Sequence, residues 1–155
     1  MFIHGVLNDH SVWILQSRYF ANHGWNVLAI DLPGHGRSGG KAPASVQEAA
    51  QSVIALMDAA GVNKAILMGH SFGSLIAMQA AAEHPDRVSQ LVMVGTAYPM
   101  RVSPALLESS ISHPHKDMFK PSTHRAIESF LASQTRQQLD KLATAKDIPM
   151  MSLPR

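Results

Sequence analysis

The chain has 155 residues, of which 46% are apolar and 15% are charged, and its formal net charge is +2. This length suits one domain with a hydrophobic core and is too short for two. The small charge, without a long basic run, argues against nucleic acid as a partner, and the absence of cysteine excludes disulfide and thiolate chemistry. No secretory signal is visible, and no apolar run approaches the roughly 20 residues that span a bilayer. We therefore expect a cytoplasmic protein with no membrane partner.

The N-terminal part alternates strand and helix patterns. Residues 1–3 resemble the end of a strand, residues 11–22 a helix, and residues 26–30 a second strand. His23 and Gly24 supply the stop signal of the helix. Its apolar face is expected to consist of Val12, Leu15 and Tyr19.

A second helix begins after Pro43. Ser45 and Glu48 have the spacing of a capping box, in which each satisfies backbone groups at the start of a helix, and Gly61 ends the helix. Its buried stripe is expected to be Ala49, Val53, Leu56, Met57 and Ala60.

The next segment holds a strand at 65–68, a helix from about 72 to 84 that stops before Pro85, and a strand at 90–94. The resulting order, β-α-β-α-β-α-β, is typical of a parallel sheet. We predict an α/β fold whose sheet is built from about 1–3, 26–31, 64–69 and 90–95, with helices on both faces.

The character changes after Ala97. Four prolines divide residues 98–121 into short pieces, helical patterns return at about 123–133 and 136–145, and no strand pattern follows the strand that ends at Val94. We expect residues 98–147 to form a helical insertion over the C-terminal edge of the sheet. The histidine pair at 113 and 115 lacks a partner carboxylate or cysteine, so no metal site is predicted.

The most informative motif is Gly69-His70-Ser71-Phe72-Gly73, which lies between the strand at 65–68 and the following helix. A G-x-S-x-G sequence in this context is typical of a nucleophile elbow, where a strained turn exposes the serine hydroxyl. The glycines are explained by the close approach of strand and helix backbones, and the start of the helix favours developing negative charge.

Three motifs in this order resemble the α/β-hydrolase superfamily: His4-Gly5-Val6, the segment 31–38 (DLPGHGRS), and the motif at 69–73. The resemblance implies a partial α/β-hydrolase fold, with residues 1–97 as its core and residues 98–155 as a helical cap-like region. In the family's strand numbering, the four predicted strands would be neighbours in the order 4-3-5-6.

Roles of individual residues follow from the same resemblance. Ser71 would be the nucleophile, and the backbone N–H groups of Val6 and Phe72 would form the oxyanion hole. His4, Gly5, Gly69, His70 and Gly73 would be the residues of the two loop motifs. We expect His70 to be a pocket wall or a packed residue rather than the base, and Asp31 to bond its own loop backbone. No cofactor is expected.

The acid and base that normally follow the serine are not found. No carboxylate follows the strand ending at Val94, and the late histidines (His113, His115 and His124) lie in the cap-like region. We therefore expect an incomplete chain, a poorly active fragment that lacks the family's N-terminal strands and C-terminal part. Its apolar outer strands would favour self-association through exposed sheet edges.

Three hypotheses follow. The first is a serine hydrolase that acts on a small-molecule ester or similar acyl bond through Ser71. The second is a non-catalytic binding module that retains the nucleophile elbow. The third is an interaction module whose open sheet edges pair with another chain. The nucleophile elbow favours the first, and the missing base favours the others.

Overall fold

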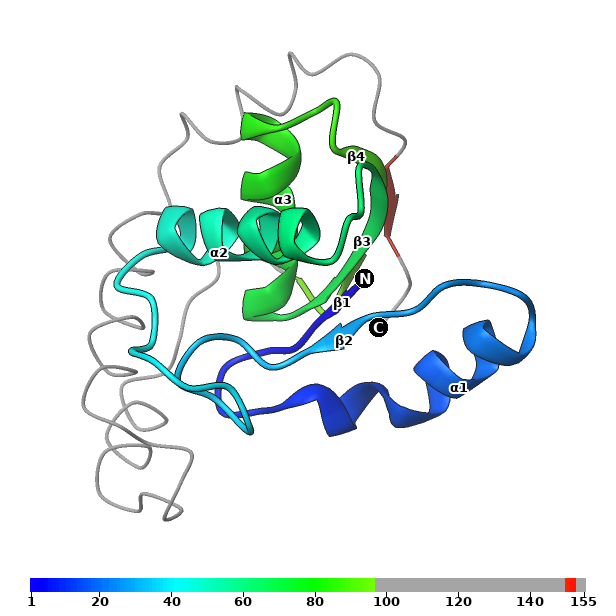
Figure 1. The fold of residues 1–155 in the computed structure, drawn as a ribbon, viewed down its shortest axis with the longest axis horizontal. Coiled ribbons are helices and arrows are strands. Elements are labelled where there is room, and N and C mark those ends of the chain that lie inside the picture. Colours follow the sequence, from blue (N-terminus) through cyan, green and yellow to red (C-terminus); the bar gives the residue numbers. More distant parts are fainter. Residues whose placement is uncertain (97–149, 153–155) are drawn as a thin grey trace.

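The computed structural model describes residues 1–96 and 150–152, and within them five strands form one parallel sheet (Figure 1). The strands are β1 (Phe2–Ile3), β2 (Ala29–Ile30), β3 (Ala65–His70), β4 (Val88–Val94) and β5 (Met150–Ser152). The helices are the 3₁₀ helix η1 (His10–Trp13), α1 (Ile14–Asn22), α2 (Val46–Ala59) and α3 (Phe72–Glu83).

The spatial order of the strands is β2-β1-β3-β4-β5, and every pair is parallel. The first four follow the predicted neighbour order, so that prediction is confirmed. Phe2 pairs with Ala29 of β2 and with Met68 of β3, which places β1 inside the sheet. The carboxyl ends of β1 and β3 therefore lie side by side, and the loops that leave them can meet.

Strand β5 corrects the expectation that no strand follows Val94. It pairs with β4, with Met150 beside Leu91, so β4 is covered along this stretch and is not an outer strand. A run of only three residues is too short to show a strand periodicity, and the pairing with β4 defines it instead. The helices predicted at 123–133 and 136–145 lie outside the described residues, as does most of the predicted cap-like region.

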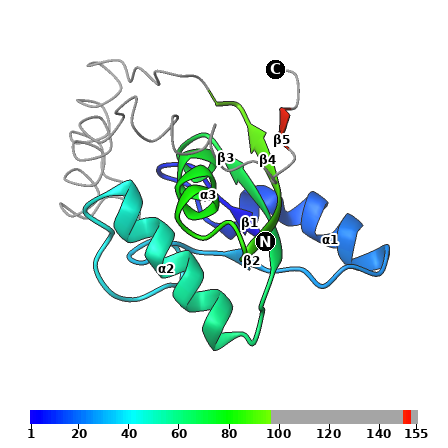
Figure 2. The same ribbon diagram turned by 90° about the horizontal axis from the view of Figure 1, so that it is seen from above.

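Helices cover both faces of the sheet, as predicted (Figure 2). Helices α2 and α3 form one layer, and α3 packs against β1, β3 and β4. Most of the buried core belongs to this layer and to the sheet beneath it, including Ile3, Met57, Leu67, Ile76 and Leu91. At roughly 25 cal/mol per Å² of buried apolar surface, this layer dominates the stability of the chain.

The layer formed by η1 and α1 differs from the prediction. Val12, Leu15 and Tyr19, the expected buried face, are 43%, 73% and 59% exposed, and α1 buries none of its residues. The segment is anchored by aromatic rings instead: Phe2 lies 5.1 Å from the ring of Trp13 and 5.9 Å from that of Phe20. The helix thus meets the sheet mainly through η1, and its apolar stripe is left uncovered by the described residues.

The start of α2 confirms the predicted cap. The hydroxyl of Ser45 accepts a hydrogen bond from the Glu48 N–H at 3.0 Å, and the Glu48 carboxylate accepts one from the Ala44 N–H at 2.7 Å. The reciprocal bond reaches one residue further back than in the usual capping box, but it satisfies the same kind of backbone donor.

The amino terminus is part of the sheet. The Met1 ammonium donates to the carbonyl of Ile66 at 2.7 Å, and the Met1 carbonyl accepts from the Met68 N–H at 2.9 Å. Burial lowers the pKa of this amino group to about 6.

None of the helices in the described ranges has the length and apolar content that crossing a bilayer requires.

Candidate active site

Ser71 forms the turn between β3 and α3, as the motif predicts. Its backbone has φ 52° and ψ −117°, a conformation that residues other than glycine rarely adopt. The Ser71 N–H donates to the carbonyl of Val94 at 2.9 Å, and the Ser71 carbonyl accepts from the Ser74 N–H at 3.0 Å. These bonds hold the strained turn in place, so the predicted elbow geometry is confirmed.

The flanking glycines are required by close backbone contacts. A Cβ atom on Gly69 would collide with the backbone of Gly73, and a Cβ atom on Gly73 would collide with the carbonyls of Ile3 and His4. Strand β3, helix α3 and the end of β1 therefore touch through backbone atoms at one point. Two of the glycines that the motif predicts are explained by this contact alone.

The loop after β1 lies against Ser71. A Cβ atom on Gly5 would lie 3.2 Å from the Cβ of Ser71, and the carbonyl of Gly5 accepts from the Asn8 N–H at 3.3 Å to close a turn. Leu7 in this turn has φ 65°, and Leu7 and Ser71 are the two non-glycine residues with positive φ in the described part of the chain. Backbone strain thus collects where the two loop motifs meet.

Val6 and Phe72, the predicted oxyanion-hole residues, each lie one position beyond this contact. Val6 follows Gly5 and packs, half-buried, against the core, and Phe72 follows Ser71 and begins α3. The structure therefore brings together the two segments that carry the predicted donors.

His4 is fully buried between the loop after β1 and the loop after β2. Its Nε2 accepts from the Leu32 N–H at 3.1 Å, and because a backbone N–H can only donate, the imidazole proton lies on Nδ1. That Nδ1–H donates to the carbonyl of Gly5 at 2.7 Å. Burial is the main cause that lowers the pKa of His4, which keeps the ring neutral.

His70 borders a pocket, in agreement with its predicted role as a wall. The pocket has a volume of about 190 Å³ and lies between η1, α1 and the ends of β3 and β4; it is lined by Val12, Trp13, Gln16, His70 and Val94. The rings of Trp13 and His70 meet edge to face at 6.4 Å. The pocket is mainly apolar, and His70 provides its titratable group.

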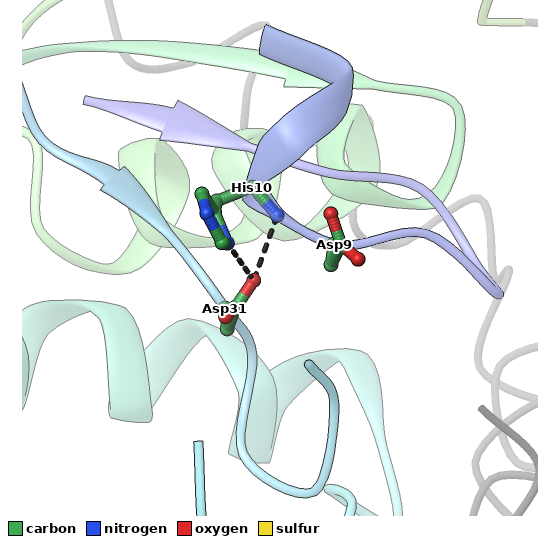
Figure 3. A group of neighbouring side chains, drawn as sticks. All are labelled: Asp9, His10 and Asp31. Carbon is green, nitrogen blue, oxygen red and sulfur yellow. Dashed lines mark hydrogen bonds and ion pairs between the residues drawn. The ribbon is translucent and has the colours of Figure 1, made fainter. Parts of the chain in front are cut away.

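Asp31 connects two loops. As expected, it bonds its own loop, since its carboxylate accepts from the Arg37 N–H at 2.9 Å. It also accepts from the N–H of His10 at 2.7 Å and faces His10 Nδ1 at 2.9 Å (Figure 3). Burial alone would raise the pKa of Asp31, but the bonds from Arg37 and His10 outweigh burial and hold it below its usual range.

This pairing could not be predicted from the sequence, because His10 and Asp31 lie 21 positions apart and belong to no common motif. Asp9 lies beside them, and ligand atoms of all three residues fall within 4.8 Å of one another (Figure 3). The Asp9 carboxylate, however, accepts from the Ser11 N–H at 2.7 Å, and Asp31 already accepts three donors. The carboxylate oxygens of Asp9 and Asp31 thus accept mainly from backbone N–H groups. We therefore interpret the cluster as a link between loops.

The acid and base of a catalytic triad remain unassigned. His113, His115 and His124 lie outside the described residues. In the described part of the chain, the Nδ1 of His10 is paired with Asp31, and the segment after β4 begins with Gly95 and Thr96, which carry no carboxylate.

Comparisons with known proteins agree with this geometry. The family model described as alpha/beta hydrolase fold matches residues 1–134. A pimeloyl-[acyl-carrier protein] methyl ester esterase of Edwardsiella ictaluri is 36% identical over 108 residues, which are 68% of this chain and 40% of that protein. Lipase LipV of Mycobacterium tuberculosis is 36% identical over 95 residues, 61% of this chain and 36% of the lipase. The chain thus spans about two fifths of the length of these relatives.

Solved structures share the fold. The N-acyl homoserine lactonase AidH, complexed with N-butanoyl homoserine, has a TM-score of 0.75 at 22% identity, and the match covers 96% of this chain and 67% of that one. A carboxylesterase of Nitrososphaera gargenis has a TM-score of 0.72 at 18% identity, covering 97% and 69%. Together with the elbow at Ser71 and the order of the parallel strands, these matches show that the chain belongs to the α/β-hydrolase fold family.

Proposed function

We propose that this protein is a serine hydrolase that acts on an ester or similar acyl bond through Ser71. The observation that carries the proposal is the strained turn at Ser71, with the loop after β1 packed against it. Strain of this kind persists where the surrounding structure enforces it and is concentrated at functional sites. Relatives that match this chain are named as an esterase and a lipase, which supports the same class of reaction.

The chemistry of the proposal needs donors as well as a nucleophile. Attack by the Ser71 hydroxyl on an acyl carbon would convert the carbonyl into a tetrahedral oxyanion. The N–H groups of Val6 and Phe72 would stabilise this charge, together with the start of α3. Loss of one such donor typically costs about 10²–10³-fold in rate. The contact of Gly5 with Ser71 supports this assignment, because Val6 is the residue that follows Gly5.

No base for Ser71 is assigned among the described residues, and this limits the expected rate. A serine hydroxyl is a weak nucleophile at its own pKa and needs a group that removes its proton. Without the triad's contribution, serine hydrolases retain only about 10³–10⁴-fold acceleration over water from the oxyanion hole and binding. We therefore expect activated esters to acylate Ser71 slowly, and we expect the chain to hydrolyse these esters poorly.

A second candidate is a non-catalytic module that binds a small molecule beside the elbow. The pocket bordered by Trp13 and His70 favours it, together with the absence of a carboxylate at Gly95 and Thr96.

Self-association is a separate proposal, supported by the exposed apolar side chains of Trp25 and Leu28 next to the outer strand β2. Sedimentation at several concentrations tests it. A cytoplasmic location stays a prediction from the sequence.

The test of the hydrolase proposal uses a p-nitrophenyl ester and a fluorophosphonate probe on three chains: the wild type, Ser71→Ala and Ser17→Ala. Ser17 is a half-buried serine of α1, as Ser71 is half-buried in its turn, and serves as the matched control. We expect slow modification of the wild type and of Ser17→Ala at Ser71, identified by mass spectrometry, and none of Ser71→Ala. Modification or ester cleavage that survives Ser71→Ala would contradict the proposal. A wild-type chain that binds the ester reversibly without being modified would favour the binding module.

A further inference from the structure

His4 ties the carboxyl ends of two neighbouring strands together. It follows β1, accepts from the Leu32 N–H just beyond β2, and donates to the carbonyl of Gly5. His4 is 0% exposed and Leu32 is 1% exposed, so water does not replace either bond. Gly5 in turn contacts Ser71. The imidazole is therefore a buried side-chain bridge between the β2 loop and the loop that contacts Ser71, in addition to the link between Asp31 and His10.

Only the neutral imidazole with its proton on Nδ1 fits this bridge. A second proton would sit on Nε2 and face the Leu32 N–H, so that two donors would oppose each other without an acceptor. A buried donor that loses its acceptor bears the full cost of desolvation. Protonated His4 must therefore move, and Gly5 is bonded to its other nitrogen.

The groups around His4 decide how readily it accepts a proton. The ring of His35 lies 5.3 Å away, and a positive charge there disfavours a second one on His4. The carboxylates of Asp31 and Asp9 act in the opposite direction. His70 also lies close to Gly5, since a Cβ atom on Gly5 would lie 3.2 Å from Nδ1 of His70. Burial, the largest influence, lowers the pKa of His4, so the bridge stays intact at neutral pH.

We propose that His4 is a positioning residue that holds the Gly5–Asn8 loop against Ser71, and that protonation of His4 in mild acid releases this loop. The proposal deepens the proposed function, on which its catalytic consequence rests. The oxyanion donor assigned to Val6 would leave its place when the loop is released. The site would thus carry an acid-sensitive element that is separate from any catalytic base.

Hydrogen exchange of single amides tests the bridge without reference to activity. In the wild type, protection of the Leu32 amide, corrected for intrinsic exchange, should fall about tenfold or more as the pH is lowered and His4 gains its second proton, because its acceptor is lost. The Ala49 amide, which donates to Ser45 in α2, should not change and is the internal control. Carbon and nitrogen shifts of the His4 ring should report the Nδ1–H tautomer at neutral pH.

Variants separate His4 from its neighbours. His4→Gln retains an acceptor and a donor but cannot titrate, so its Leu32 protection should not depend on pH. His4→Ala should show low Leu32 protection at every pH. His35→Gln should keep the wild-type transition, although shifted, because it leaves His4 titratable and removes the charge that His35 can carry beside it. If Leu32 protection stays constant until the whole chain unfolds, or falls equally in His4→Gln, the proposal is wrong.

Labelling of Ser71 by the fluorophosphonate probe tests the positioning role. The ratio of wild-type to His4→Gln labelling rates should fall about tenfold as the pH drops, and the wild type should approach His4→Ala in acid. If Leu32 protection falls but this ratio does not, the bridge exists and its positioning role is refuted. If Ser71 is not labelled in any variant at any pH, the hydrolase proposal fails, and the exchange data alone decide whether protonation releases the loop.

Discussion

The two helical layers of this molecule differ both in sequence and in packing. Helix α3 buries ten of its twelve residues between α2 and the sheet, whereas α1 buries none. Helix α3 is apolar on nearly every side, as buried helices are, whereas α1 carries an apolar stripe beside polar residues such as Gln16 and Arg18. An apolar stripe shows which face of a helix avoids water, and only the neighbouring elements show whether that face is covered.

The uncovered surface is continuous with one edge of the sheet. Around the outer strand β2 and helix α1, the exposed large apolar side chains are Val12, Ile14, Leu15, Tyr19, Trp25 and Leu28. Where such apolar side chains form a contiguous patch, they mark an interaction surface. Helix α3, which follows Ser71, lies on the well-packed side of the sheet, whereas η1 and α1, which border the pocket at His70, lie on the open side.

Truncation of one side chain in each helical layer should give the largest difference in the free energy of unfolding. Ile76 in α3 is fully buried, and Ile76→Ala should lower the free energy of unfolding by about 2–5 kcal/mol, since it removes core packing and leaves a cavity. Leu15→Ala in α1 should change it by less than about 0.5 kcal/mol. Urea denaturation of both variants measures the two effects.

A large loss of stability in Leu15→Ala would break the comparison, because it would show that the α1 stripe is covered in solution. In that case sedimentation of the same variant would show whether a second copy covers it.

Backbone packing should give the next largest effect. Gly73→Ala places a Cβ atom against the carbonyls of Ile3 and His4, so we expect a loss of about 1–3 kcal/mol from overpacking. Gly39→Ala is the matched control, because nothing lies within 4 Å of its added Cβ and its φ is not positive. Thermal unfolding compares them, and equal melting temperatures would show that α3 and β1 separate more easily than the structure implies.

Helix caps should give the smallest difference. Ser45→Ala removes the acceptor of the Glu48 N–H at the start of α2 and should cost about 1 kcal/mol. Asp9→Ala removes the corresponding acceptor of the Ser11 N–H at η1, but a four-residue helix anchored by Trp13 depends less on its cap. We expect less than about 0.5 kcal/mol for Asp9→Ala, measured by urea denaturation. A larger loss in Asp9→Ala than in Ser45→Ala would contradict the comparison.

The sequence predicted those features that depend on neighbouring residues. The cap at Ser45, the turn at Ser71 and the ends of α3 rest on contacts within a few positions, and the structure confirms them. The order of the first four strands was also predicted, from the resemblance to the α/β-hydrolase superfamily, and the structure confirms it. Strand β2 is shorter than predicted, at Ala29–Ile30, because β1 offers only two residues for pairing.

Contacts between distant residues could not be predicted. His4 meets Leu32 over 28 positions and His10 meets Asp31 over 21, and each pair depends on where the sheet places the loops. The resemblance named His4 as a motif residue but gave no partner for its ring. The predicted burial of the apolar face of α1 was wrong for the same reason, since burial is a property of the whole fold.

In preparations where Met1 is the free terminus of the polypeptide, its buried amino group affects how they compare with one another. Its pKa of about 6 lies below the usual value of 8.0, so between these values the unfolded chain binds a proton that the folded chain does not. Stability is therefore expected to decrease as the pH falls from 8 towards 6, by at most about 3 kcal/mol. A fusion tag or an acetyl group turns this amine into an amide, which does not titrate. Tagged and untagged forms are thus not interchangeable in stability assays, even when the tag is far from Ser71.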